Sequence, residues 1–174
     1  MSQHAQRHFT ATAFVIDSQN RVLLLWHKRL KRWMPPGGHV DPNEIPEETA
    51  RRECKEETAL DVEIIGDGST GLTAGDQENM FTENPHEGRM LKKPFALLLE
   101  NIPDCPERNE KAHQHMDFVY RARPTDETQA LALLEDEGTE LRWFTADEIR
   151  ALDHRTEIFA NVKHYILRIL AQQA

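Results

Sequence analysis

Cysteine is scarce in this 174-residue chain, which contains only Cys54 and Cys105. Two thiols without close spacing make neither a disulfide framework nor a zinc motif, so we expect both to be reduced. Long apolar runs are also missing, and no apolar stretch of the sequence is long enough to cross a bilayer. Residues 1–10 lack the apolar core of a secretion signal. We therefore expect a cytoplasmic protein that does not associate with membranes.

Positive charge is in deficit, because 21 Lys and Arg residues face 30 Asp and Glu residues, for a formal net charge of −9. Nucleic acids are bound by clustered basic residues, so general nucleic-acid binding is not expected. Small phosphorylated ligands remain compatible with this charge, since a metal ion can screen carboxylates locally. The length predicts a single domain over residues 1–174, and the sequence leaves a homodimer open.

Carboxylates are concentrated on a helix predicted to end near Leu60. Glu53, Glu56 and Glu57 are spaced i, i+3 and i+4, which places them on neighbouring parts of one helical face. Three ionised carboxylates this close repel one another unless a cation, such as a divalent metal with oxygen ligands, neutralises them. The alternative is an exposed, charge-rich helix in water.

The same helix carries a stripe of small side chains, Ala50, Cys54 and Thr58. These residues should press against a sheet, while the glutamates face along the sheet edge into a cleft. Ahead of the helix, residues 35–38 read Pro-Pro-Gly-Gly. Glycine has no Cβ, so we expect a turn whose backbone approaches a ligand closely.

The order of these residues resembles the signature box of the Nudix hydrolases, which cleave nucleoside diphosphates linked to another group. The matching segment is Gly38-x5-Glu44-x7-Arg52-Glu53-Cys54-Lys55-Glu56-Glu57-Thr58-Ala59-Leu60. The chain departs from the box at Ala59, where the family has glycine. Alanine in a left-handed position after a helix should cost on the order of 1 kcal/mol or shift the helix end.

The resemblance implies a fold and a set of roles. The fold is an α/β/α sandwich with a central mixed β-sheet between helices, and the cofactor is Mg²⁺, with Mn²⁺ as an alternative. The implied roles are catalysis by Arg52, Glu53, Glu56 and Glu57, metal ligation by Glu53, Glu56, Glu57 and the backbone of Gly38, and structural support by Gly37, Gly38 and Glu44. Arg52 is expected to pair with carboxylates. Glu53 could serve as ligand or general base, and Glu107, Glu110 or a glutamate within residues 67–92 are alternative bases.

The periodicity along the chain predicts the remaining elements. Residues 9–17 and 21–27 should form a hairpin, and the second of these strands is apolar enough to be covered on both sides. Further strands are expected at 61–65, 94–101, 113–120 and 140–144, followed by a helix capped at Thr145 and an amphipathic helix within 158–170. Residues 67–92 read as a polar loop insertion.

Two further groups are candidates for substrate binding. His113, His115 and Asp117 share one face of their strand. They could bind zinc, although residues along one strand are widely spaced for a shared ion; they could be merely solvated; or they could line a substrate wall, as a similar strand does in many Nudix chains. Arg29, in the basic run 27–32, either contacts substrate phosphate or is a solvated strand end.

The resemblance therefore implies a metal-dependent hydrolase that cleaves a diphosphate linkage in a small phosphorylated, nucleotide-type substrate. A catalytically silent nucleotide-binding or sensor Nudix domain is an alternative, although such domains commonly lose the box carboxylates present here. A prenyl-diphosphate isomerase is another, although neither Cys54 nor Cys105 stands in the segment before the box. Residues 74–79 carry no marker of a substrate subgroup.

Overall fold

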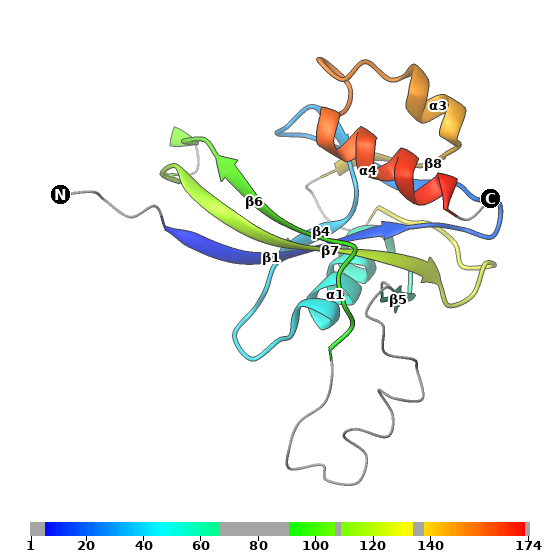
Figure 1. Ribbon diagram of the computed structural model, residues 1–174, viewed down its shortest axis with the longest axis horizontal. Helices are drawn as coiled ribbons and strands as arrows, with labels where there is room; N and C mark the ends of the chain where they lie inside the picture. Colours follow the sequence, from blue (N-terminus) through cyan, green and yellow to red (C-terminus); the bar gives the residue numbers. More distant parts are fainter. Residues whose placement is uncertain (1–5, 67–90, 107–108, 134–137, 173–174) are drawn as a thin grey trace, which may run out of the picture.

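The computed structural model describes residues 6–66, 91–106, 109–133 and 138–172, which form two β-sheets and flanking helices (Figure 1). The strands are β1 (Arg7–Val15), β2 (Val22–His27), β3 (Arg32–Met34), β4 (Gly37–His39), β5 (Val62–Ile65), β6 (Ala96–Ile102), β7 (His113–Pro124) and β8 (Gly138–Phe144). The helices are α1 (Pro46–Thr58), α3 (Ala146–Ala151) and α4 (Ala160–Ala171). None of the described helices is long and apolar enough to span a membrane.

The larger sheet has five strands, in the order β4-β1-β7-β5 with β6 also paired to β7. Strands β1 and β7 run parallel with Thr10 opposite Asp117, whereas β4, β5 and β6 pair antiparallel with their neighbours. The first part of β7 pairs with β6 and its last part with β5. The sheet is therefore mixed, as expected, and its centre is a parallel pair formed by segments more than one hundred residues apart.

The predicted hairpin of the first two strands is wrong. Strand β2 belongs to a second, three-stranded sheet in the order β3-β2-β8, and it meets the end of β1 only through a bridge between Ile16 and Val22. The chain changes sheets at Asp17, whose carboxylate accepts hydrogen bonds from the backbone amides of Gln19 and Arg21. The prediction that β2 is covered on both sides is confirmed, because Leu23 and Leu24 are buried in different cores.

These two cores lie on opposite faces of the larger sheet, with α1 on one side and α3 and α4 on the other (Figure 1). On the α1 side, Ala50 and Cys54 pack with Ala11 and Ala13 of β1, and small side chains on both elements let the helix lie close to the sheet. Larger side chains fill the other core, including Phe14 of β1. The α/β/α arrangement is therefore as expected.

The helix ends follow local chemistry. Helix α1 begins at Pro46, where a missing N–H is harmless. It ends at Thr58, and the next residue, Ala59, adopts the left-handed conformation with φ 64° while its N–H donates to the carbonyl of Lys55. The helix end has thus kept the geometry that glycine would favour. Thr145 and Glu148 form the predicted capping box of α3, and residues 67–90 of the predicted loop lie outside the described residues.

Candidate functional site

A cleft of about 870 Å³ opens over the side of β1, β4 and β7 that faces α4. Its floor includes Thr10 and Thr12 of β1, and its walls include Tyr165 of α4. Its lining also includes Gly37, Gly38 and Glu57, together with the histidines and acidic groups near the start of β7. The cleft therefore joins the segment resembling the Nudix box to the strand predicted separately to bind substrate.

The two glycines bring α1 and β4 together. The Gly37 N–H donates to Glu57 Oε2 at 3.0 Å. A Cβ on Gly37 would lie 2.7 Å from the carbonyl oxygen of Ala11, and one on Gly38 would overlap the Glu53 carboxylate. The predicted glycine turn is wrong in form, because these residues belong to β4, which pairs with β1. Their lack of a Cβ is nevertheless what the close approach requires.

Arg52 lies at the centre of a carboxylate network. Its Nε and Nη2 donate to the two oxygens of Glu44 at 2.8 and 3.1 Å. Its Nη1 donates to Glu53 Oε1 and Glu56 Oε2, both at 2.8 Å. The guanidinium holds the pKa of Glu44 down at about 2, and Glu44 is the main reason that the pKa of Arg52 is raised. A backbone bond from Nη2 to the carbonyl of His39, at 3.0 Å, connects this network to the end of β4.

The three glutamates differ in burial. Glu57 is 5% exposed and lines the cleft, whereas the side chains of Glu53 and Glu56 are 13% and 44% exposed. Burial of Cys54, with Glu57 and Glu53 nearby, raises the pKa of that thiol. Arg52 offsets part of the charge of Glu53 and Glu56, whereas Glu57 is the one of the three glutamates that lines the cleft.

Asp117 lies on the cleft floor and is 4% exposed. It accepts hydrogen bonds from the Thr10 hydroxyl at 2.9 Å and the Thr12 hydroxyl at 3.1 Å. Burial raises its pKa, and burial together with Asp117 raises the pKa of Glu100 on the neighbouring strand. Neither threonine was predicted from the sequence, because their proximity to Asp117 depends on the parallel pairing of distant strands.

Arg29 also lines the cleft, and its Nη1 lies 3.6 Å from Glu110 Oε2. The structure therefore places a predicted phosphate-binding residue beside one predicted alternative base. Glu107, another alternative base, lies outside the described residues.

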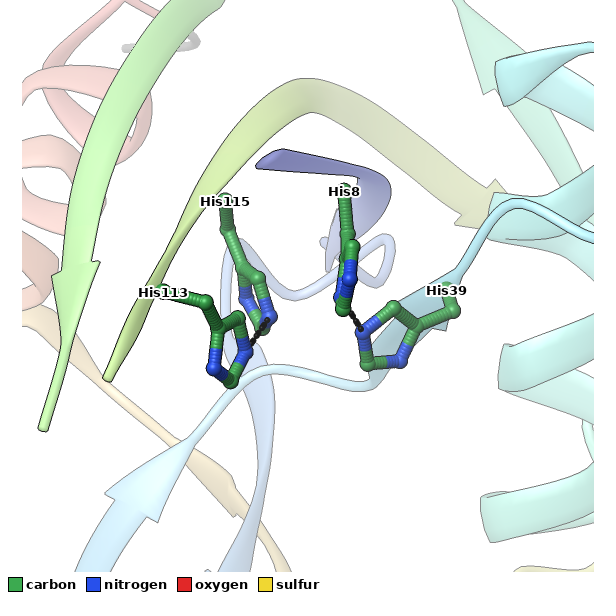
Figure 2. Close-up of side chains that lie close together, drawn as sticks. All are labelled: His8, His39, His113 and His115. Carbon is green, nitrogen blue, oxygen red and sulfur yellow. Dashed lines mark hydrogen bonds between the residues drawn. The ribbon is translucent and has the colours of Figure 1, made fainter. Parts of the chain in front are cut away.

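Four histidines gather on one face of the larger sheet, and two of them, His8 and His39, were not predicted from the sequence (Figure 2). The other two are His113 and His115. Burial and the neighbouring histidines lower the pKa of His39, and the same causes with Arg29 lower that of His115 to about 4. The alternation His8-x-Thr10-x-Thr12 was the available signal, but only the β1–β7 register shows which residues it faces.

Comparison with known proteins agrees with this geometry. The sequence profile of the NUDIX domain family matches residues 6–164. A Clostridium perfringens hydrolase of the NUDIX family, solved by crystallography, superposes with a TM-score of 0.73 at 25% identity, covering 97% of this chain and 99% of that one. An Ap4A hydrolase from C. elegans shares the fold at a TM-score of 0.59 and 17% identity, covering 97% of this chain and 100% of that one.

Curated relatives match over shorter segments. A probable DHNTP pyrophosphohydrolase of Lactococcus lactis is 29% identical over 72% of this chain and 59% of its own length. An RNA pyrophosphohydrolase of Hydrogenovibrio crunogenus is 30% identical over 55% of this chain and 61% of its own length. The chain thus spans about 60% of the length of these two relatives. Since the family profile covers nearly the whole chain, the protein belongs to the Nudix hydrolase family, as its sequence predicted.

Proposed function

We propose that this protein is a metal-dependent hydrolase that cleaves a diphosphate linkage in a nucleotide-type substrate. The observation that carries the proposal is Glu57, a buried carboxylate that opens onto a large cleft and is fixed there by the Gly37 amide. Membership of the Nudix family supports the same reaction class. Several relatives are named for such chemistry, including a putative 8-oxo-dGTP diphosphatase of Bacillus subtilis that is 41% identical over 58 residues, 32% of this chain and 39% of its own length.

The donor set suits a hard divalent cation. Glu53, Glu56 and Glu57 offer carboxylate oxygens, and Gly38, whose Cα lies against the Glu53 carboxylate, offers a backbone carbonyl. Oxygen donors of this kind are preferred by Mg²⁺ and Mn²⁺. We assign metal ligation to Glu56, Glu57 and the backbone of Gly38, with Glu53 either completing this ligand set or serving as the general base. A bound ion would offset the charge of the phosphates and lower the pKa of a water nucleophile.

Arg52 would act by positioning the ligands. Its fork fixes Glu44 with two hydrogen bonds, and its Nη1 connects Glu53 to Glu56. The attacking water must lose a proton, and Glu53 lies one helical turn from Glu56, so we propose Glu53 as the acceptor. Glu110, which lines the cleft, is an alternative base, as are Glu107 and a glutamate within residues 67–92.

Arg29, His115 and Asp117 would form the substrate wall. Arg29 supplies positive charge for a phosphate group. His115 is neutral at pH 7, because its pKa is about 4, so it would act by hydrogen bonding rather than by charge. Cytoplasmic location, a single domain and a small-molecule substrate stay predictions alongside these roles.

A substrate screen tests the proposal. Nucleoside triphosphates, nucleotide sugars, dinucleoside polyphosphates and capped RNA fragments should be incubated with the protein and Mg²⁺ or Mn²⁺, and the products identified. We expect cleavage of a diphosphate linkage that stops in excess chelator. Tight nucleotide binding without turnover would instead identify a silent binding or sensor domain.

A matched pair of variants tests the substrate wall. Arg29→Gln should raise KM for a phosphorylated substrate far more than it lowers kcat, because uniform binding is lost. Arg123 is a suitable control, since it pairs with Glu63 on the outer part of the sheet and does not line the cleft. An equal KM in Arg29→Gln, Arg123→Gln and the parent would remove Arg29 from the wall.

A further inference from the structure

Four of the nine histidines in the chain converge on one face of the larger sheet. His8 comes from β1, His39 from the end of β4, and His113 and His115 from β7. One ligand nitrogen from each ring can be chosen so that all four lie within 4.8 Å of one another. Within the described residues, no other group of three or more His, Cys, Asp or Glu side chains meets that criterion, including the glutamates of α1.

Strand register explains why the rings meet. His8 lies directly opposite His115 in the parallel β1–β7 pair, and partners in register project from the same face. His113 is two residues before His115, so it also shares that face. His39 lies opposite Thr10, the next same-face residue after His8. Three adjacent strands therefore each present imidazole at one place on the sheet.

The distances between nitrogens are near those of ligands on one ion. His113 Nε2 lies 3.0 Å from His115 Nε2, and His8 Nδ1 lies 3.3 Å from His39 Nε2 (Figure 2). Two imidazole nitrogens bound tetrahedrally to Zn²⁺ at 2.0–2.1 Å are about 3.4 Å apart. Small rotations of the rings would bring the two pairs around a common centre.

The tautomer of His113 is also suited to a metal. Its Nδ1 lies 2.8 Å from the carbonyl oxygen of Lys111, and a carbonyl can only accept, so the proton is on Nδ1. The lone pair is therefore on Nε2, the atom that faces His115. A histidine that ligates a metal commonly donates its other N–H to a backbone carbonyl in this way.

Hydrogen bonds between imidazoles explain the short distances within the His113–His115 pair and within the His8–His39 pair. They do not explain why the two pairs lie together. Protonated histidines at these separations would repel one another, whereas neutral imidazoles can share a metal ion through their lone pairs. Glu110 and Asp41 lie close to His39, and their carboxylates would favour a bound cation, whose charge four neutral imidazoles leave uncompensated.

We propose that His8, His39, His113 and His115 form a second metal site, a closed four-imidazole centre for a first-row transition-metal ion, with Zn²⁺ the best match. Imidazole nitrogen selects Zn²⁺ and its neighbours over Mg²⁺, so the site is chemically separate from the oxygen donors of α1. With His115 bound to this ion, Arg29 and Asp117 would remain as the substrate-contacting residues of the wall, and the ion would hold β1, β4 and β7 together. It would also stabilise the segment that matches the Nudix box, because the carbonyl of His39 accepts a hydrogen bond from Arg52.

Metal titration tests the proposal without any activity measurement. The full chain, purified without a histidine tag and stripped with chelator, is titrated with Zn²⁺ by calorimetry and with Co²⁺ by visible absorption, in excess Mg²⁺ to saturate the carboxylates. We expect one ion per chain and a tetrahedral Co²⁺ spectrum. His113→Ala should weaken binding by at least about 100-fold, since a ligand is lost outright.

Two control variants distinguish binding at the four histidines from binding elsewhere on the chain. His154→Ala removes an exposed histidine outside the cluster and should bind Zn²⁺ like the parent. Glu57→Gln should also keep full Zn²⁺ affinity, even if it abolishes hydrolysis, which keeps this inference distinct from the proposed function. Because His39 lies at the exposed end of β4, His39→Ala provides a second ligand variant should His113→Ala fail to fold.

Absence of stoichiometric Zn²⁺ binding to the parent would overturn the proposal. So would equal affinity in the parent, His113→Ala and His39→Ala. A raised melting temperature with Zn²⁺ in the parent and in His154→Ala, but not in the cluster variants, would support it, because an ion that binds the folded state stabilises that state.

Discussion

Replacing Arg52 by alanine should lower both the stability and the activity of the protein. The guanidinium is 26% exposed and donates to Glu44, Glu53 and Glu56, with two bonds to Glu44. Alanine would leave these carboxylates facing one another without a counter-charge. Exposed ion pairs contribute about 0–1 kcal/mol, whereas losing one partner of a buried pair costs about 3–5 kcal/mol. The Arg52 network is partly buried, so its contribution should fall between these two ranges. We therefore expect Arg52→Ala to lower the free energy of unfolding by about 3 kcal/mol.

Thermal and urea unfolding measure this loss. For a chain of this size, about 3 kcal/mol corresponds to a fall in Tm of roughly 6–12 °C. Arg52→Lys retains the charge but not the planar fork, so it should fall between the parent and the alanine variant. Mg²⁺ should restore part of the lost stability if the proposed ligands bind it. A melting temperature unchanged in Arg52→Ala would show that the network does not stabilise the fold.

The pH dependence supplies an independent check on the same pair. The pKa of Glu44 is lowered from 4.5 to about 2 in the folded protein. A lowered pKa contributes stability that is fully present above the unfolded pKa and is lost as pH falls through the folded value. The parent should therefore lose stability as pH falls from about 4.5 toward 2. Arg52→Ala should lose less over that interval, because its Glu44 pKa returns toward the ordinary value.

Three further predictions concern the box. Ala59→Gly should raise the free energy of unfolding, measured in urea titrations, by about 0.5–1 kcal/mol, because it relieves a left-handed alanine. Ala160→Gly, at the exposed start of α4, is the control and should lower the free energy of unfolding. Equal losses in both variants would show that Ala59 is not strained. Gly38→Ala should reduce activity more than Tm, since its Cβ would displace the Glu53 carboxylate, and steady-state rates beside melting curves will show whether that displacement matters. Glu53→Gln should lower kcat and change its acid-side pH dependence while metal affinity falls less than in Glu57→Gln; equal metal losses would make Glu53 a ligand and move the search for the base elsewhere.

Local patterns in the sequence predicted α1 well. The small residues Ala50 and Cys54 mark its buried stripe, and Glu57, beside that stripe, lines the cleft. Helical periodicity depends only on nearby residues, so it can be read directly from the chain. The alternation of His113, His115 and Asp117 likewise predicted a shared strand face.

Long-range pairing could not be read in the same way. Adjacent strands suggested a hairpin, but Asp17 turns the chain away from β1 and into the second sheet. The neighbours of Asp117 and His115 come from β1, across a parallel pairing that no local pattern specifies. Zinc was a poor fit for one strand alone, because its ligands would be too far apart. Four ligands for one ion are available only because His8 of β1 and His39 of β4 lie beside His113 and His115 in the folded chain.

Hydrolysis as a function of Mg²⁺ concentration, in the parent and in Glu57→Gln, tests the central claim most directly. Glu63→Gln is the matched control, because Glu63 is an exposed carboxylate of β5 paired with Arg123 away from the cleft. With the best substrate from the screen, the parent and Glu63→Gln should show rates that rise with Mg²⁺ and vanish in chelator. Glu57→Gln should lose most of its activity while its melting temperature stays close to that of the parent. Full turnover in chelator, or in a folded Glu57→Gln, would contradict a metal-dependent reaction centred on this helix.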